Sequence, residues 1–110
     1  MLNRAALIVR PAAPFLAWAK SLDDSGALPN PAGEQTVYLV PEFGTDPEGE
    51  DVLRLVYAGV FARELHGWHI IEADWPKDRS FAAFKKWFHV ELHSVVEDIC
   101  ADPLVDDDEV

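Results

Sequence analysis

The sequence predicts a small α/β or α+β domain, in which a two- to three-stranded sheet packs against three helices. Two short apolar runs, 4–10 and 36–40, are each followed by a proline, which ends a strand because it cannot donate to the ladder. Two longer stretches, 50–67 and 80–101, repeat apolar residues at the helical period. The predicted order is strand, helix, strand, helix, an optional third strand, and helix.

The first strand is predicted over residues 4–10, where an apolar run with β-branched residues indicates burial on both faces. Pro14 suits the first turn of a helix, since its missing N–H is not needed there. This helix is predicted to continue to about Leu22, on apolar residues at helical spacing: Phe15, Trp18, Ala19 and Leu22.

Residues 23–34 contain two prolines and two glycines and are predicted to form a long loop, more readily a tolerated insertion than a functional one. The second strand is predicted over 36–40. If it ran parallel to the first strand, the helical connection would be right-handed. A turn-rich segment, 43–49, follows.

The second helix is predicted to begin near Glu50, where acidic residues complement the positive helix start, and to end at Gly67. Ile70 and Ile71 then form either a short third strand or a packed loop, and both alternatives stay open.

The third helix is predicted over 80–101, with Ser80 as its N-cap. Its apolar arc combines seven residues: Phe81, Phe84, Phe88, Leu92, Val95, Val96 and Ile99. An isolated helix could not leave so much apolar surface in water, so we expect a sheet or other helices to cover it.

Length and composition indicate one globular domain, residues 1–101, followed by a mobile acidic tail, residues 102–110. The hydrophobic fraction is 49%, and no apolar run approaches the roughly 20 residues of a membrane-spanning helix. Cys100 is the single cysteine and is expected to be an inert thiol. A chain that cannot form an internal disulfide is typical of the reducing cytoplasm.

The formal net charge is −11, and five of the 20 acidic residues lie in the last nine positions. Nucleic-acid binding is disfavoured, because phosphate contacts need clustered Lys and Arg. An acidic surface keeps a protein soluble, or attracts a basic partner.

Three residues suggest a metal site if the helix over 80–101 forms. His89 and His93 would lie one turn apart, with Glu97 continuing the row. Two imidazoles and a carboxylate can bind zinc. The alternative is that these three residues form only a polar strip beside the apolar arc of a half-exposed helix. The sequence predicts no cofactor and keeps a transition metal such as zinc as an alternative.

Glu64 falls in the middle of the apolar arc of the second helix. A carboxylate there must be paired, protonated or hydrated, and desolvation is expected to raise its pKa unless a cation pairs with it. It is either a catalytic or ligand-anchoring group in a cleft, or a structural carboxylate that accepts hydrogen bonds from backbone donors or a Tyr hydroxyl.

Two tryptophans and a second glutamate are further binding candidates. On the predicted third helix, Trp87 faces outward and suggests an interface with a protein partner or a second copy. Trp75 either joins that surface or plugs the end of the core. Glu91 borders the apolar arc and projects away from His93, so these two are not expected to act together.

The stretch Trp75-Pro-Lys-Asp-Arg-Ser-Phe-Ala-Ala-Phe-Lys-Lys-Trp-Phe-His-Val-Glu-Leu-His-Ser, with Tyr38-Leu-Val-Pro-Glu before it, resembles a family of small uncharacterised bacterial proteins. The resemblance implies a bacterial, soluble, single-domain protein and supplies no site residues.

The leading functional hypothesis is a small cytoplasmic binding or interaction protein without catalysis, whose surface is the helix over 80–101 and the adjoining loop. The alternatives are a metal-binding protein or metal-dependent enzyme that uses His89 and His93, and an acidic regulator that docks on a basic partner. No phosphate-binding glycine loop or nucleophile elbow is present in the sequence.

Overall fold

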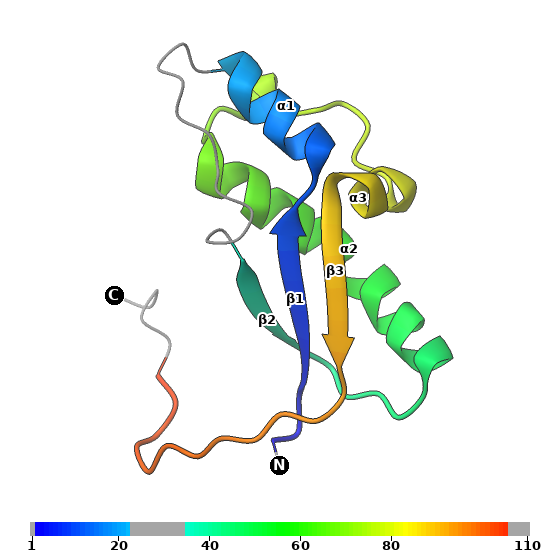
Figure 1. Ribbon diagram of the computed structural model, residues 1–110, viewed down its shortest axis with the longest axis vertical. Helices are drawn as coiled ribbons and strands as arrows, with labels where there is room; N and C mark the ends of the chain where they lie inside the picture. The colour runs from blue at the N-terminus through cyan, green and yellow to red at the C-terminus, as the bar shows by residue number, and fades with distance from the viewer. Residues whose placement is uncertain (1, 23–34, 106–110) are drawn as a thin grey trace.

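The computed structural model describes residues 2–22 and 35–105, and within these ranges the fold is α+β, as predicted. Figure 1 shows an antiparallel sheet in the order β2-β1-β3. The strands are β1 (Ala5–Pro11), β2 (Thr36–Val40) and β3 (Phe88–His93). The helices are α1 (Ala13–Leu22), α2 (Asp46–Trp68) and α3 (Phe81–Trp87), with a 3-10 turn, η1 (Glu72–Asp74), before α3.

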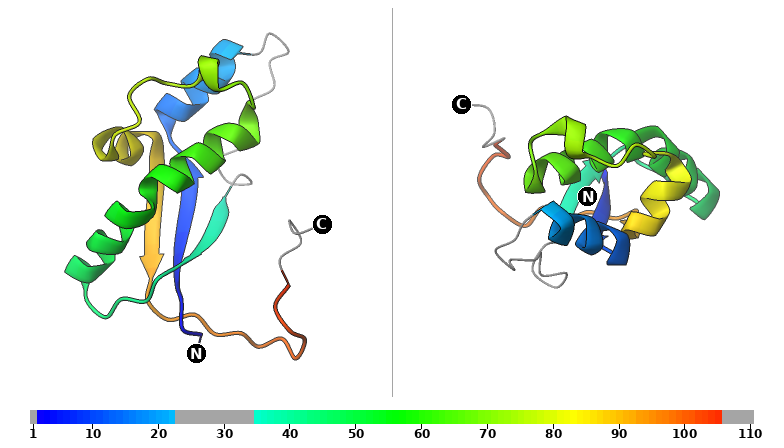
Figure 2. Two further views of the ribbon diagram at one scale, coloured as in Figure 1. Left: turned by 180° about the vertical axis from the view of Figure 1, so that it is seen from behind. Right: turned by 90° about the horizontal axis from the view of Figure 1, so that it is seen from above.

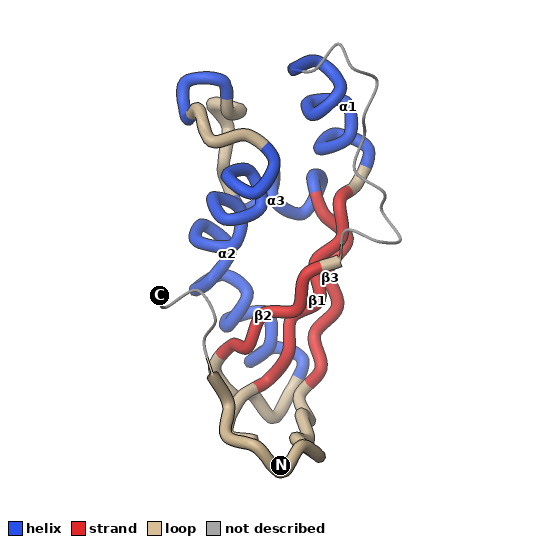
Figure 3. Tube along the Cα trace, turned by 90° about the vertical axis from the view of Figure 1, so that its left-hand side faces the viewer, coloured by secondary structure: helices blue, strands red, loops and turns tan. Residues whose placement is uncertain are grey.

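Helix α2 covers one face of the sheet, and the opposite face of the sheet carries no helix in the described part of the chain (Figures 2 and 3). Successive strand residues point to opposite faces, so β1 turns its fully buried Ala5, Leu7 and Val9 toward α2. Leu7 lies between Tyr38 of β2 and Leu92 of β3 in the register. The outer face therefore receives the residues that alternate with these.

An aromatic cluster fills the space between the sheet and the helices. Phe61 of α2 is fully buried, and its ring centroid lies 5.9 Å from that of Phe84 and 5.4 Å from that of Phe88. The rings meet in tilted or edge-to-face orientations, which aromatic pairs prefer. This cluster joins α2, α3 and β3 into one core.

The predicted long third helix is wrong beyond Trp87. Helix α3 ends there, and the chain continues directly as β3. From Phe88 to His93 apolar and polar residues alternate strictly, which places Phe88, Val90 and Leu92 on the inner face of the sheet. Six paired positions with β1 place this segment in the sheet, where its backbone groups that face β1 find hydrogen-bond partners.

The third strand is therefore β3, and not the Ile70–Ile71 segment that the sequence offered for it. Ile70 and Ile71 are exposed and precede η1. The two strands that flank α1 are antiparallel, so the right-handed crossover expected for parallel strands does not occur. The expected loop over 23–34 and the last five residues of the expected acidic tail lie outside the described residues.

Helix α2 begins four residues before the predicted Glu50. The side chain of Thr45 accepts a hydrogen bond from the Glu48 amide, and the Glu48 carboxylate accepts one from the Gly44 amide. Together with Pro47 in the first turn, this arrangement is close to a capping box. The helix also continues one residue past Gly67, to Trp68. No helix in the described ranges has the length and apolar character needed to cross a membrane.

Removal of the Thr45 cap should destabilise the protein modestly. We expect Thr45→Ala to lower the free energy of unfolding by about 1 kcal/mol, because the Glu48 amide loses its acceptor. Thr45→Ser keeps the hydroxyl and should stay within about 0.5 kcal/mol of the original protein. Urea titrations followed by circular dichroism measure both, and equal values for Thr45→Ala and the original protein would contradict the capping role.

Candidate functional site

Glu64 faces β2 and accepts two hydrogen bonds from it. The Tyr38 hydroxyl donates to Glu64 Oε2 at 2.6 Å, and the Thr36 hydroxyl donates to the same oxygen at 3.2 Å. Thr36 and Tyr38 alternate along β2 and therefore point to the same inner face of the sheet. The sequence placed Glu64 in the apolar arc of its helix and offered a Tyr hydroxyl as a partner, and the structure agrees with both.

A pocket of about 150 Å³ opens beside Glu64, between the end of β1, the start of β2 and the C-terminal part of α2. We call it the Glu64 pocket and define it by its six lining residues: Pro11, Phe15, Thr36, Glu64, Gly67 and Trp68. A carboxylate, a hydroxyl and two aromatic rings thus meet around one small space. A wider, shallower groove lies on another side of the same helix end and is lined by Arg63, His66 and Trp75, among others.

Tyr38 remains a hydrogen-bond donor over the ordinary pH range. Burial raises the pKa of its hydroxyl well above the usual value of 10.0, and the hydrogen bond to Glu64 and the negative charge of that carboxylate raise it further. The positive charge of Arg63 and the hydrogen bond with Thr36 oppose the rise but do not cancel it.

Alkaline titration tests this environment. Because the folded pKa of Tyr38 lies above the unfolded value, its contribution to stability is present below about pH 10 and decreases as the pH rises beyond it. In a Tyr57→Phe background, which leaves Tyr38 as the single tyrosine, tyrosinate absorbance should therefore appear only well above pH 10. A midpoint at pH 10 or below would contradict the proposed contact with Glu64.

The three polar residues of β3 form one row on the outer face of the sheet. His89, Glu91 and His93 alternate with the buried residues of the strand and are exposed. Glu91 Oε1 lies 3.2 Å from Arg10 Nη2 of β1, and Glu91 Oε2 lies 3.3 Å from His93 Nε2. The expectation that Glu91 and His93 project apart is thus wrong, because they lie on a strand. Ion pairs as exposed as these contribute at most about 1 kcal/mol.

The metal site was predicted on the assumption that residues 80–101 form one helix, and this assumption is also wrong. Four residues along a strand span about 13 Å, so His89 and His93 no longer lie one above the other. Glu97 lies beyond the end of β3 and is exposed. Among residues 2–22 and 35–105, no three His, Cys, Asp or Glu side chains lie close enough together to hold a metal ion.

Trp87 does not face outward as the helical wheel predicted. It is half-buried, and its ring centroid lies 5.8 Å from that of Phe61, 6.0 Å from that of Trp18 and 6.3 Å from that of Phe15. Helix α3 ends at Trp87, so the chain turns there and the indole packs under α1. An interface role for Trp87 remains a prediction. The outward-facing indole that suggested this role is half-buried in the structure.

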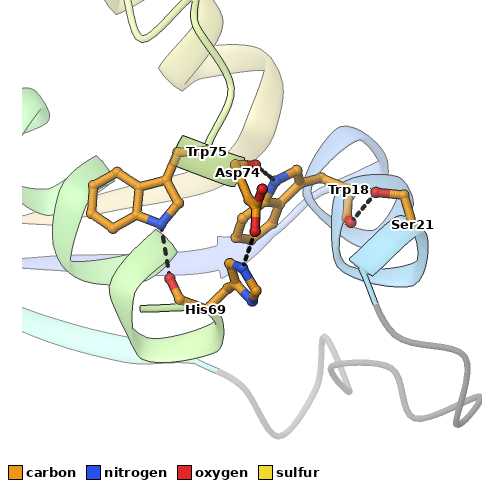
Figure 4. A network of polar contacts seen from close by, with 5 residues as sticks. All are labelled: Trp18, Ser21, His69, Asp74 and Trp75. Atoms are coloured by element: carbon orange, nitrogen blue, oxygen red, sulfur yellow. Dashed lines mark hydrogen bonds and ion pairs between the residues drawn. The ribbon is translucent and has the colours of Figure 1, made fainter. Parts of the chain in front are cut away.

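Trp75 takes the second of its two predicted roles and plugs one end of the core. It is 9% exposed, and its indole Nε1 donates to the His69 carbonyl at 2.8 Å. Figure 4 shows the polar network around it. His69 Nε2 lies 2.8 Å from Asp74 Oδ2, and Trp18 Nε1 donates to the Asp74 carbonyl at 2.9 Å. These hydrogen bonds connect α1 to the segment between α2 and α3.

The sequence interpretation missed Tyr38, Thr36 and Phe15 as neighbours of Glu64. The alternation of Thr36, Tyr38 and Val40 along a predicted strand signals that these three share a face. No sequence pattern states which helix residue that face meets, because α2 and β2 come together only through the fold.

No protein-family model, curated protein or solved structure gives a significant match to this chain.

Proposed function

We propose that this protein is a small non-catalytic binding protein whose ligand occupies the Glu64 pocket. The observation that carries the proposal is the Glu64 carboxylate, which lines the pocket while two hydroxyls of β2 hold one of its oxygens. A charged group oriented by hydrogen bonds from a rigid element is preorganised to anchor a ligand. Phe15 and Trp68 supply apolar walls, as in most small-molecule sites.

A fragment screen by two-dimensional ¹H–¹⁵N NMR tests the pocket. A mixture of neutral, cationic and anionic fragments should include some that shift the Thr36 amide and the Trp68 indole signals. Glu64→Leu should abolish these shifts. Asp51→Leu is the matched control, because it replaces an exposed carboxylate of the same helix that does not line the Glu64 pocket. Fragments that bind while leaving the Thr36 and Trp68 signals unchanged would refute the proposal.

A second candidate function is self-association through the edge of β2 that pairs with no other strand among the described residues. Strand β2 has no charged residue, and its outward Val37 and Leu39 are 60% and 50% exposed. The edge strand β3 instead carries the polar row of His89, Glu91 and His93 on its outer face, which protects an edge against pairing. Antiparallel pairing of β2 with β2 of a second copy would bring the apolar halves of two outer faces together and keep the polar rows of the two β3 strands apart.

Sedimentation analysis tests this candidate. The original protein should form a concentration-dependent dimer, and Leu39→Lys should shift it to monomer because two lysines would then meet at the shared edge. Leu55→Lys is the control, since Leu55 is 73% exposed on α2, away from the β2 edge. A protein that stays monomeric throughout the concentration series would rule out the dimer.

We also propose that the protein is cytoplasmic. The exposed thiol of Cys100, the single cysteine in the sequence, supports this location, because such a thiol stays reduced there.

A further inference from the structure

We infer that the Glu64 pocket recognises a cation, either a primary ammonium or a guanidinium group; this inference rests on the proposed function and names the chemical class of the ligand. Glu64 is the acidic group among the six lining residues, and none of the six carries a positive charge. An ammonium or guanidinium is the group that a carboxylate binds most strongly through charge-assisted hydrogen bonds.

The helix adds to the negative potential at the pocket. Glu64 lies about one turn before the C-terminal end of α2 at Trp68, where the carbonyl groups of the helix carry a partial negative charge. A carboxylate at this end is disfavoured by that charge, and a bound cation offsets the repulsion. The net charge of −11 also attracts cations toward the protein surface.

Two aromatic rings line the same pocket and favour the same class of ligand. The electron-rich faces of Phe and Trp rings attract ammonium and guanidinium groups. Phe15 is 4% exposed and is fixed by its neighbours, with ring centroids 5.3 Å from Trp18 and 5.5 Å from Phe88. A wall held in this way does not have to be ordered when the ligand binds.

The size of the pocket limits the part of the ligand that enters. A volume of about 150 Å³ lies below the roughly 300–1,000 Å³ of pockets that enclose drug-sized molecules. The pocket therefore takes a cationic head group with a short apolar stem, and the remainder of the ligand stays outside. A free amine and a basic side chain of a peptide share this chemistry.

Tyr38 and Thr36 act as positioning residues for Glu64. Both hydroxyls donate to Oε2, so they orient the carboxylate without adding charge. Because the pKa of Tyr38 is raised by its burial and by Glu64, the hydroxyl stays protonated and keeps this role at physiological pH.

Matched four-carbon probes test the charge preference: n-butylammonium, n-butylguanidinium, 1-butanol and butyrate, each titrated against the full chain by NMR at low salt. The two cations should bind at least about tenfold more tightly than 1-butanol, which is the ratio that one charge-assisted contact of about 1.4 kcal/mol provides. Butyrate should leave the Thr36 and Trp68 signals unchanged. A lysine- or arginine-containing tripeptide then distinguishes a free amine from a peptide side chain as the source of the cation.

Variants assign the preference to Glu64. Glu64→Gln keeps an acceptor for Tyr38 and should reduce the cation preference to less than about twofold. Asp51→Asn removes the same charge from an exposed position on α2 and should retain the preference. Tyr38→Phe keeps the charge of Glu64 but loosens its orientation, so cations should bind about three- to tenfold more weakly and still outcompete 1-butanol.

Two results would overturn the inference. One is 1-butanol or butyrate binding as tightly as the cations at the Thr36 and Trp68 signals, in which case the pocket still binds ligands and only the charge class fails. The other is an undiminished cation preference in Glu64→Gln. If no fragment of any charge reaches the pocket in the screen described above, the proposed function itself fails.

Discussion

Phe61→Ala is expected to lower the free energy of unfolding by about 3–5 kcal/mol, the usual cost of deleting a buried aromatic ring. Phe61 is fully buried, and its ring contacts those of Phe84, Trp87 and Phe88. The cavity would open where α2, α3 and β3 meet, so no single element could move to fill it. Since domains of this size are stable by about 5–15 kcal/mol, the variant should lose a large share of its stability.

Chemical denaturation of Phe61→Ala and Leu55→Ala measures this effect on one helix. Leu55 is 73% exposed, so its truncation should change the free energy of unfolding by less than about 0.5 kcal/mol. A similar small loss for both variants would show that α2 does not pack on the sheet through Phe61. Circular dichroism at low denaturant should also show that Leu55→Ala keeps the full helical signal.

Trp75→Ala should have the second largest effect, a loss of about 3–5 kcal/mol. The side chain is almost fully buried, and its indole N–H is bonded to the His69 carbonyl. Truncation removes the plug and leaves that carbonyl without its donor. The neighbouring bond from Trp18 to the Asp74 carbonyl should weaken as a consequence, which would free α1 from the 69–75 segment.

Trp75→Phe separates packing from hydrogen bonding. It keeps an aromatic ring and removes the N–H, so the loss should fall to about 1–3 kcal/mol. Ile70→Ala, at a position that is 71% exposed in the same segment, should be nearly neutral. Faster hydrogen exchange of the α1 amides in Trp75→Ala, but not in Ile70→Ala, would confirm the coupling to α1. Unchanged exchange in both variants would contradict it.

Much of the fold was predictable from local signals. Strand β2 and helix α1 have the bounds that apolar runs, prolines and helical spacing predict, and β1 differs by one residue at each end. The early start of α2 was also encoded, in Thr45, Pro47 and Glu48, which act within one helical turn and need no tertiary contact. Such features depend on residues close in sequence.

The candidate site was predictable in one residue only. The position of Glu64 in an apolar arc marks a carboxylate that the fold must partner, and this is a statement about one helix. Its partners Tyr38 and Thr36 lie 26 and 28 residues away along the chain. Neither the helix nor the strand specifies the other, so the pocket between them exists only in the folded protein.

The sequence by itself determined that an acidic chain combines a small sheet with helices, as an α/β or α+β fold, because composition and hydrophobic period act locally. The antiparallel strand pairing then selected α+β. Only the tertiary structure decided that residues 88–93 form a strand and not part of a helix. Phe88 and Leu92 fit a helical arc, whereas Phe88, Val90 and Leu92 fit a strand. Pairing with β1 selects the strand, since it hydrogen-bonds the facing edges of both segments and buries the inner row against α2. As a result, His89 and His93 are spaced along an edge strand, and the half-buried Trp87 packs against the aromatic core.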